Sequence, residues 1–388
     1  MDRNIPSLTG FRGLLAFWVL LYHVSAAGTM MNVPLGEHLS SAFLHFLDLG
    51  ALGVDGFFLL SGFVLSYVYG QSLGTGFSFA ASKKFILLRL ARIYPVHAFI
   101  ILSYAALKLA GIVFPVEYCG VPTETPDIVN DISCHRFGLY EMMRHLTLLS
   151  AWWGGWGSLS WNPLDWSVSA EWMAYLSFPL LILLVRHIRH GLLTLMLAIA
   201  SLGAQYLWMQ HEGYSLPNIP IGAFGAQRIY FEFIAGMLMH QFYRSPLYAK
   251  MPWHAIAYLV IGGFIAAYVL ESHPFVTALL FVPLILVLAQ PSGVVSQLLS
   301  TRLAVWLGHI SFSLYMCHVF VMEVLGVITV GSAPEPQEAS PISWLEGLGM
   351  LGGIMVASIA FAAFLYHGVE EPSRRWLRKH IGASANHN

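Results

Sequence analysis

The chain has 388 residues, of which 57% are hydrophobic and only 10% are charged, with a mean hydropathy of +0.66. An ordinary soluble chain carries about 25% charged residues and could not hide this much apolar surface in one core. The composition therefore indicates a protein that uses lipid as its solvent. The net charge of −1 argues against a nucleic-acid partner, and three cysteines are too few for a metal cluster.

Ten apolar runs are long enough to cross a hydrocarbon core, which takes about 20 residues of helix. They predict an all-α, polytopic membrane protein with a bundle of about ten transmembrane helices. The first run holds two ionisable residues and is followed by no small-residue cleavage site, so no signal peptide is expected. The predicted spans are approximately 9–28, 50–70, 92–114, 168–186, 191–210, 228–243, 254–271, 274–290, 304–329 and 345–367.

The distribution of basic residues predicts the orientation of these spans. With the N-terminus in the cytoplasm, 15 of the 19 Lys and Arg residues fall on the inner side, as the positive-inside rule requires. Only Lys108, Arg136, Arg144 and Arg228 stay outside or at outer helix ends. Both termini are then cytoplasmic, and the chain is a multi-pass protein of the cytoplasmic (inner) membrane.

The whole chain, 1–388, is predicted to form a single membrane domain with one large outer loop, 115–167, and a disordered tail from about 381. The loop holds Cys119 and Cys134. In an oxidising compartment these two could form a disulfide, and the alternative is two free thiols.

An ionisable side chain inside a span indicates function, because burying it is costly unless it is paired or hydrated. Arg12 and His23 lie in the first span, eleven residues apart. Eleven residues at about 100° each make almost three full turns, so both side chains are expected on one face of the helix. The alternatives are an arginine that reaches the lipid surface and a histidine satisfied by a neighbouring helix.

Two carboxylates are expected at the depth of His23, in the outer half of the membrane. Asp55 lies in the second span and Glu171 near the start of the fourth. Three ionisable groups at one depth are typical of a buried acid–base site. Asp55 could instead cap the start of its helix. His318 in the ninth span, with Tyr315 on the same face, is a weaker member or a structural histidine.

A second cluster is predicted on the cytoplasmic side. Arg89 and Arg92 are three residues apart on one helix face. Together with Lys83, Lys84 and Arg12 they are expected to form a basic entrance at the cytoplasmic end of the helices. Guanidinium groups suit phosphates, although plain positive-inside anchoring would also produce such a cluster. The aromatic stretch WWGGWGSLSWNPLDW could stack on sugar rings or form an interfacial belt.

Six segments in order resemble the membrane-bound acyltransferase family 3, the multi-spanning enzymes that modify cell-envelope carbohydrates. The resemblance runs from about residue 5 to residue 378. LTGFRGLLAFWVLLYHV resembles the opening helix, with its Arg, ten residues and then His. The other matching segments are GVDGFFLLSGFVLS (Asp55, Ser61, Gly62), RLARIYP (Arg89, Arg92), WSVSAEWMAYLSFPLL (Trp166, Ser167, Glu171), ISFSLYMCH (Ser311, Tyr315, His318) and YHGVEEPSRRW (Glu370, Pro372).

The resemblance implies transfer of an acyl group, usually acetyl, from acyl-CoA to a carbohydrate or glycolipid hydroxyl on or near the outer side of the membrane. Acyl-CoA would be a co-substrate, with no permanently bound cofactor and no metal. His23 would act as general base or acyl carrier, with Asp55 or Glu171 holding its imidazole. The resemblance implies that the donor binds Arg12, Arg89, Arg92 and Ser61, and that the acceptor binds Trp166, Tyr315 and His318.

Two other functions fit the same sequence. A ten-span chain with ionisable groups at mid-membrane is also expected for a transporter or flippase, although no pair of matching interrupted helices is found. The other is a binding or sensing protein that keeps the acyl-CoA site without turnover. The pattern does not distinguish among acceptors such as O-antigen, exopolysaccharide and peptidoglycan, or define the acyl length and the oligomeric state.

Overall fold

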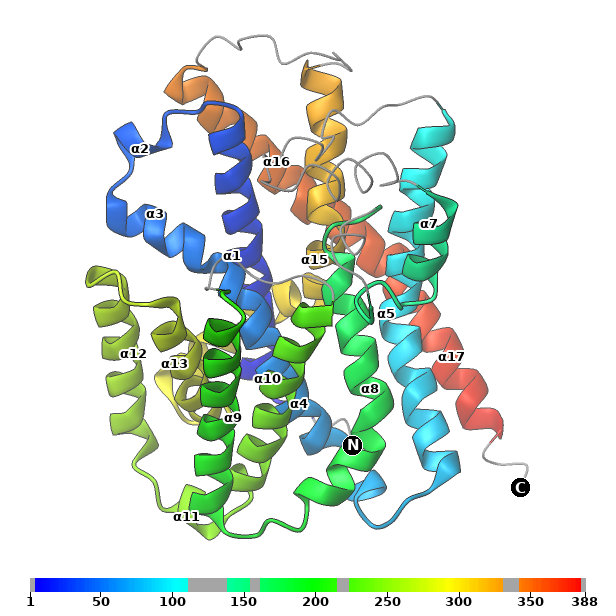
Figure 1. Ribbon diagram of the computed structural model, residues 1–388, viewed down its shortest axis with the longest axis vertical. Coiled ribbons are helices and arrows are strands. Elements are labelled where there is room, and N and C mark those ends of the chain that lie inside the picture. The colour runs from blue at the N-terminus through cyan, green and yellow to red at the C-terminus, as the bar shows by residue number, and fades with distance from the viewer. Residues whose placement is uncertain (1–3, 111–137, 154–160, 215–222, 331–341, 385–388) are drawn as a thin grey trace.

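A computed structural model of the protein describes residues 4–110, 138–153, 161–214, 223–330 and 342–384. These ranges form helices joined by turns and contain no β-strand, which confirms the predicted all-α class (Figure 1). Each of the ten predicted spans falls on one long helix. They are α1 (Pro6–Met30), α4 (Gly53–Leu73), α5 (Phe79–Leu109), α8 (Asp165–Val185), α9 (Gly191–His211), α10 (Ala223–Tyr243), α12 (Trp253–Val269), α13 (Pro274–Leu288), α15 (Arg302–Val330) and α16 (Trp344–Leu365).

The apolar character of these helices confirms a polytopic membrane protein. Within the described ranges, seven helical stretches are long and apolar enough to cross a bilayer, and α12 and α13 are apolar but shorter. The remaining helix, α10, has 21 residues but carries Arg228 and Glu232 in its first half. Both of these side chains are buried, so the charge in α10 faces other helices and not lipid.

Short helical elements connect the long ones. Two of them matter for the site: α7 (Leu139–Leu146), which precedes α8, and the amphipathic α17 (Glu371–Ser384). A turn of π-helix (Tyr366–Glu370) joins α16 to α17. The others are α2 (Leu35–His38), α3 (Ser41–Asp48), a 3₁₀ turn (Leu49–Leu52), α11 (Pro246–Ala249) and α14 (Val294–Leu299).

Local sequence explains several of the helix boundaries. Ser343 and Glu346 form a capping box that satisfies free backbone N–H groups at the start of α16. The tight connection between α12 and α13 places Glu271 at a φ of +46°, and the side chain of His273 then accepts a hydrogen bond from the backbone N–H of Phe275. The turn near Glu271 and Pro274 therefore lies where the apolar pattern predicts it.

Glycines allow close contact within two helix pairs, α1 with α15 and α4 with α10. A Cβ on Gly308 of α15 would lie 1.9 Å from the carbonyl oxygen of Thr9 in α1. At the crossing of α4 and α10, a Cβ on Gly62 would lie 2.0 Å from the carbonyl oxygen of Phe233, and one on Gly236 would lie 2.0 Å from that of Leu59. Small residues allow helix backbones to approach this closely, and van der Waals packing then replaces the hydrophobic effect that lipid does not supply.

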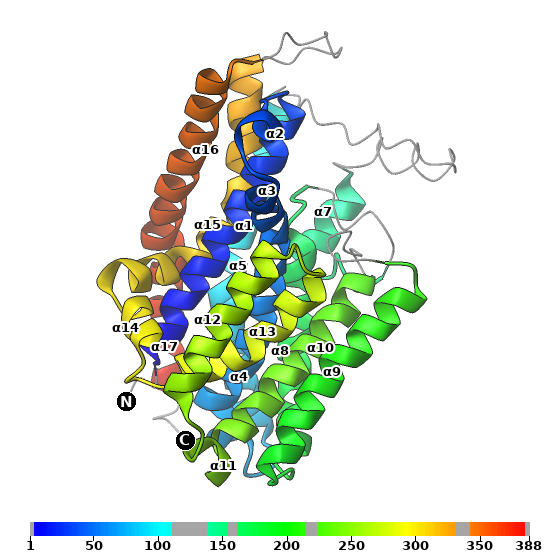
Figure 2. The ribbon, with the colours of Figure 1, turned by 90° about the vertical axis from the view of Figure 1, so that its left-hand side faces the viewer.

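The bundle has two distinct ends. The start of α1, the start of α5 and helix α17 lie at one end, whereas α2 lies at the other (Figures 1 and 2). This arrangement agrees with an even number of spans. Cys119 and Cys134 lie outside the described residues, as do the end of the tail and most of the predicted outer loop. The third cysteine, Cys317, is a free, buried thiol in α15.

Candidate active site

A cleft at the centre of the bundle gathers most of the residues that the sequence singles out. It has about 780 Å³ of empty space, its open mouth included, and is walled by α1, α4, α5, α8 and α15. Six of the predicted site residues line it: Arg12, Ser61, Arg89, Arg92, Glu171 and Tyr315.

Aromatic contacts hold Arg89 in position within this cleft. Its Nη2 donates a hydrogen bond of 2.9 Å to the hydroxyl of Tyr69, and its guanidinium carbon lies 5.2 Å from the centre of that ring. Further rings, those of Phe85 and Tyr175, lie 6.0 Å away. The Nε of Arg89 is buried and has no hydrogen-bond partner among the described residues. The guanidinium is therefore oriented by stacking and keeps an unused donor.

Glu171 lies among the arginines and not beside His23. Its carboxylate accepts hydrogen bonds from Ser61 Oγ at 3.5 Å and from the hydroxyl of Tyr175. Arg89 and Arg92 are close enough to attract it electrostatically. The sequence predicts Glu171 at the depth of His23, but the structure brings it into the basic cluster instead. The reason is the rotation of α8, which turns Glu171 towards α4 and α5.

His23 pairs with the second predicted histidine, His318 of α15. The Nε2 of His318 lies 3.2 Å from the Nδ1 of His23, and the ring centres are 4.8 Å apart. His318 is fully buried, and its Nδ1 lies 3.0 Å from the carbonyl oxygen of Leu314. The Nδ1 of His23 also lies 3.0 Å from the carbonyl oxygen of Val19.

These contacts select one set of tautomers for two neutral rings. Because a carbonyl oxygen only accepts, the proton of His318 lies on Nδ1, and its Nε2 is then an acceptor. His23 must place its own proton on Nδ1 to meet that acceptor and the carbonyl of Val19. The Nε2 of His23 is left with a free lone pair, and it has no hydrogen-bond partner in the described part of the chain. His318 thus fills the orienting role that the sequence assigns to Asp55 or Glu171.

Tyr315 connects the histidine pair to the cleft. Its ring lines the cleft and its centre lies 6.1 Å from that of His318. Its hydroxyl shares a 2.7 Å hydrogen bond with Ser167 Oγ at the start of α8. The neighbouring Trp166 is buried but does not line the cleft.

Asp55 has a partner that the sequence does not predict. Both of its carboxylate oxygens accept hydrogen bonds from Arg228 of α10, one of them at 3.0 Å. The Nε of Arg228 also lies 3.4 Å from Glu232, which accepts a 2.6 Å hydrogen bond from Gln205 of α9. All of these groups are buried. The network ties α4 to α10 and α9, and it does not bring Asp55 to His23.

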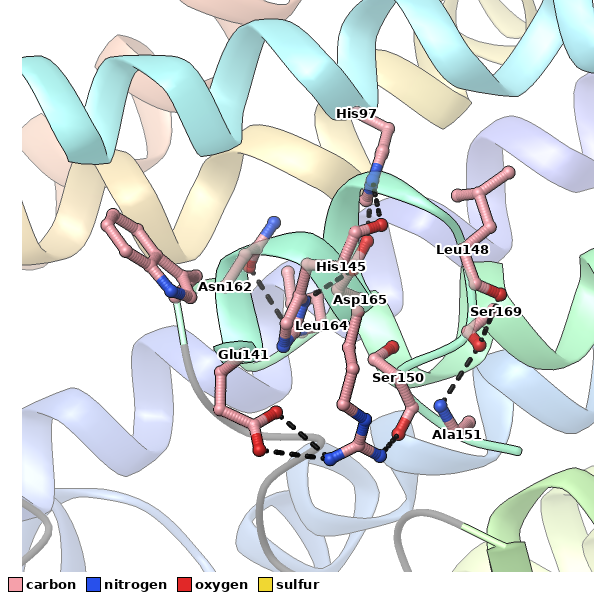
Figure 3. Close-up of polar contacts among 12 residues, drawn as sticks. His97, Glu141, His145, Leu148, Ser150, Ala151, Asn162, Leu164, Asp165 and Ser169 are labelled. Atoms are coloured by element: carbon pink, nitrogen blue, oxygen red, sulfur yellow. Dashed lines mark hydrogen bonds and ion pairs between the residues drawn. The ribbon is translucent and has the colours of Figure 1, made fainter. Parts of the chain in front are cut away.

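A third buried network, centred on Asp165, is not predicted by the sequence. Asp165, at the first position of α8, binds His97 of α5 through one oxygen and His145 of α7 through the other, the latter at 2.6 Å (Figure 3). The Nε2 of His97 lies 2.8 Å from the carbonyl oxygen of His145. Both nitrogens of His97 lie within reach of acceptor oxygens, which favours a doubly protonated ring paired with Asp165. A histidine in a span and an aspartate two residues before Ser167 were the signals available.

This His97–Asp165–His145 network fixes the walls of the cleft. It joins α5 to the start of α8. Helix α5 carries Arg89 and Arg92, and α8 carries Ser167 and Glu171. Just before α8, the Nδ2 of Asn162 donates a 3.2 Å hydrogen bond to a backbone carbonyl of α15, at Met316. Within the described ranges, no group of three or more His, Cys, Asp and Glu side chains is arranged to hold a metal ion.

Comparisons with known proteins identify the family of the chain. The sequence profile of a family described as "Acyltransferase domain" matches residues 5–367. The chain is similar to "Acyltransferase MdmB" of Streptomyces mycarofaciens, with 25% identity over 399 residues that cover 96% of this chain and 92% of the relative. It is also similar to "Putative peptidoglycan O-acetyltransferase YrhL" of Bacillus subtilis (strain 168), with 23% identity over 96% of this chain and 55% of that relative. No solved structure matches.

The Asp55–Arg228 pair leads to a stability prediction. Changing Arg228 to Met should destabilise the protein by about 3–5 kcal/mol, because it leaves a buried carboxylate without its cation. The double change Asp55→Leu with Arg228→Met should cost less than the single change, since only Glu232, and no longer Asp55 as well, then lacks its cation. The midpoint of thermal unfolding in detergent measures both, with Arg302→Met at an exposed position as the control. A double variant at least as unstable as Arg228→Met would contradict the structural role of Asp55.

Proposed function

Because this chain belongs to the acyltransferase family whose profile it matches, we propose that it transfers an acyl group, most simply acetyl, from acyl-CoA to a carbohydrate hydroxyl of the cell envelope. The carbohydrate acceptor is supported by the name of one relative, a putative peptidoglycan O-acetyltransferase, which covers 96% of this chain. The chain spans only 55% of that relative, so the relative's activity as a whole carries over as a proposal.

The observation that carries the proposal is the cleft lined by three arginines, together with the histidine pair that Tyr315 connects to it. Arg12 of α1 and Arg89 and Arg92 of α5 line the cleft. Guanidinium groups bind phosphates through charge-assisted hydrogen bonds, and acyl-CoA carries a diphosphate at the base of its long arm. The apolar walls that include Phe57, Phe58 and Phe312 suit the pantetheine and acyl part.

Glu171 supplies a counter-charge for this cluster while no phosphate is bound. Arg89 and Arg92 attract its carboxylate, and Tyr175 and Ser61 donate hydrogen bonds to it. A donor diphosphate entering the cleft would compete with Glu171 for the same guanidinium groups. The carboxylate therefore positions the arginines and does not act on the acceptor.

His23 is the general base in the proposed reaction. Its Nε2 accepts the proton of the acceptor hydroxyl while the hydroxyl oxygen attacks the thioester carbonyl carbon. The tetrahedral adduct then breaks the carbon–sulfur bond, and the imidazolium returns its proton to the departing CoA thiolate. His318 holds the other nitrogen of His23 in the donor form and accepts part of the positive charge through their 3.2 Å hydrogen bond.

The orientation in the membrane follows from the charge pattern. We propose that the end of the bundle with the start of α1, the start of α5 and helix α17 faces the cytoplasm, because 15 of the 19 Lys and Arg residues fall on that side. Acyl-CoA is present only in the cytoplasm, so the arginines of the cleft would meet the donor from inside. The acyl group would then reach an acceptor on or near the outer face of the inner membrane.

The base is tested by changes at His23. Both His23→Ala and His23→Gln should abolish acyl transfer, a loss of at least about 10²–10⁴-fold, while sparing expression and CoA affinity, because an amide accepts no proton. His318→Gln should retain some activity, since its amide oxygen can still accept the hydrogen bond from His23. The measurement is acetyl-CoA-dependent release of CoA by purified protein, with and without a glycan fragment. Near-normal turnover in His23→Gln would assign the base to another group, and release without any glycan dependence would oppose the carbohydrate acceptor.

The donor site is tested by changing Arg89 and Arg92 together to Gln. CoA binding should weaken by about 2–5 kcal/mol if two charge-assisted contacts are lost. Changing Lys83 and Lys84 to Gln removes the same charge from the same end of α5 and is the matched control. Isothermal titration with CoA distinguishes them. Equal affinity in the arginine variant and the wild type would mean that these residues only anchor the helix at the membrane surface.

The orientation is tested by cysteine labelling in a background where the three native cysteines are Ser. Cysteine placed at Ser373 in α17 should resist an impermeant thiol reagent added to intact cells, and cysteine at Glu37 in α2 should react. Helices α2 and α17, which carry the two positions, lie towards opposite ends of the bundle (Figure 1). Both should react after the membrane is permeabilised. Labelling of position 373 alone from outside would reverse the proposed orientation.

A further inference from the structure

Helix α17 presents two basic faces that differ in their surroundings. Arg374 and Arg378 are four residues apart and therefore share one face, which lines a small groove together with Tyr69 and Arg89. Arg375 and Lys379 occupy another face, and Arg375 is paired with Glu371 at 2.5 Å. Arg375, Lys379 and Arg378 are exposed, whereas Arg374 is only partly exposed. The helix itself is seated on α5, where Pro372, Trp376 and Leu377 lie beside Ala91 and Pro95. The inner face is thus held against the helix that carries Arg89 and Arg92.

The cations on that inner face are poorly neutralised. The contact of Arg374 with Glu370 is long, at 3.4 Å, and Glu370 is buried and also accepts a 2.8 Å hydrogen bond from Ser313. Arg378 has no hydrogen-bond or ion-pair partner among the described residues. Arg92 and Arg378 are both near enough to repel Arg374. A cluster of like charges held this closely is stabilised by an anion.

Arg89 connects this groove to the central cleft, because its side chain lines both. Two anion sites therefore adjoin one another and share Arg89. The site in the central cleft also has Arg12 and Arg92, and the site in the groove beside α17 also has Arg374 and Arg378. A ligand that carries two separate phosphate groups would occupy both. Acyl-CoA is such a ligand, since it has a diphosphate and, on its ribose, a separate 3′-phosphate.

We propose that Arg374 and Arg378, together with Arg89, form a subsite for the ribose 3′-phosphate of acyl-CoA. The inference rests on the proposed function, in which acyl-CoA is the donor. It assigns a binding role to the C-terminal amphipathic helix, and it makes that helix a determinant of the choice between CoA and donors that lack the third phosphate. An anionic lipid headgroup carries the same chemistry and is the other source of a phosphate at this position.

The experiment compares the affinities of two ligands, CoA and 3′-dephospho-CoA, for three proteins in nanodiscs of zwitterionic lipid. The proteins are the wild type, Arg374→Gln with Arg378→Gln, and the control Arg375→Gln with Lys379→Gln. The control removes the same charge from the same helix. The wild type and the control should bind CoA about 10- to 100-fold more tightly than dephospho-CoA, as one or two charge-assisted contacts would give. The inner-face variant should lose this preference and keep the wild-type affinity for dephospho-CoA, which also reports that it is folded.

Each other outcome is decisive. Equal affinity of the wild type for both ligands, or equal weakening of both in the inner-face variant, would overturn the subsite. Absence of any CoA binding by the wild type would refute the donor in the proposed function, and the subsite with it. A variant that keeps the preference for CoA but loses affinity for vesicles with added phosphatidylglycerol would assign the two arginines to lipid headgroups instead.

Discussion

A charge buried among membrane helices must find a partner on another helix, and such pairs hold three walls of the cleft, α4, α5 and α8. Asp55 binds Arg228 and so ties α4 to α10, while Asp165 binds His97 and His145 and ties α8 to α5 and α7. Leaving either partner alone would cost several kcal/mol, because no water is available to solvate it. The helices are therefore held in one register by groups that do not take part in the reaction.

In the cleft, positive side chains outnumber negative ones, and this imbalance makes the cleft a candidate site. Three arginines line it, and Glu171 is the one carboxylate among its lining residues. Aromatic rings orient Arg89 without neutralising it. The surplus of positive charge is stable only because the cleft is open to solvent or ligand, and it favours a polyanionic donor. The groups that join the helices are thus each placed against an opposite charge, whereas the arginines of the cleft outnumber its one carboxylate.

A pair of histidines differs chemically from a histidine paired with a carboxylate. A neutral partner such as His318 orients the ring of His23 through a hydrogen bond but brings no negative charge to it. In the proposed reaction, the imidazolium of His23 is therefore stabilised less than it would be beside a carboxylate, and its proton passes more readily to the leaving thiolate. Such an arrangement suits a reaction in which the proton is kept for one step, since strong stabilisation of the charged ring would slow its return.

The sequence by itself determined the features that depend on a single helix. Apolar run length located all ten helices, and residue spacing placed Arg89 beside Arg92 and predicted Arg12 and His23 on one face of α1. Periodicity of 3.6 residues per turn is a local property, so these predictions needed no partner. Only the tertiary structure decided which helix each face meets. Depth and helix rotation, set by glycine crossings such as Gly62 with Gly236, brought Asp55 to Arg228, Glu171 to Arg89 and Arg92, and His318 to His23. These contacts join residues 79 to 295 positions apart in the chain.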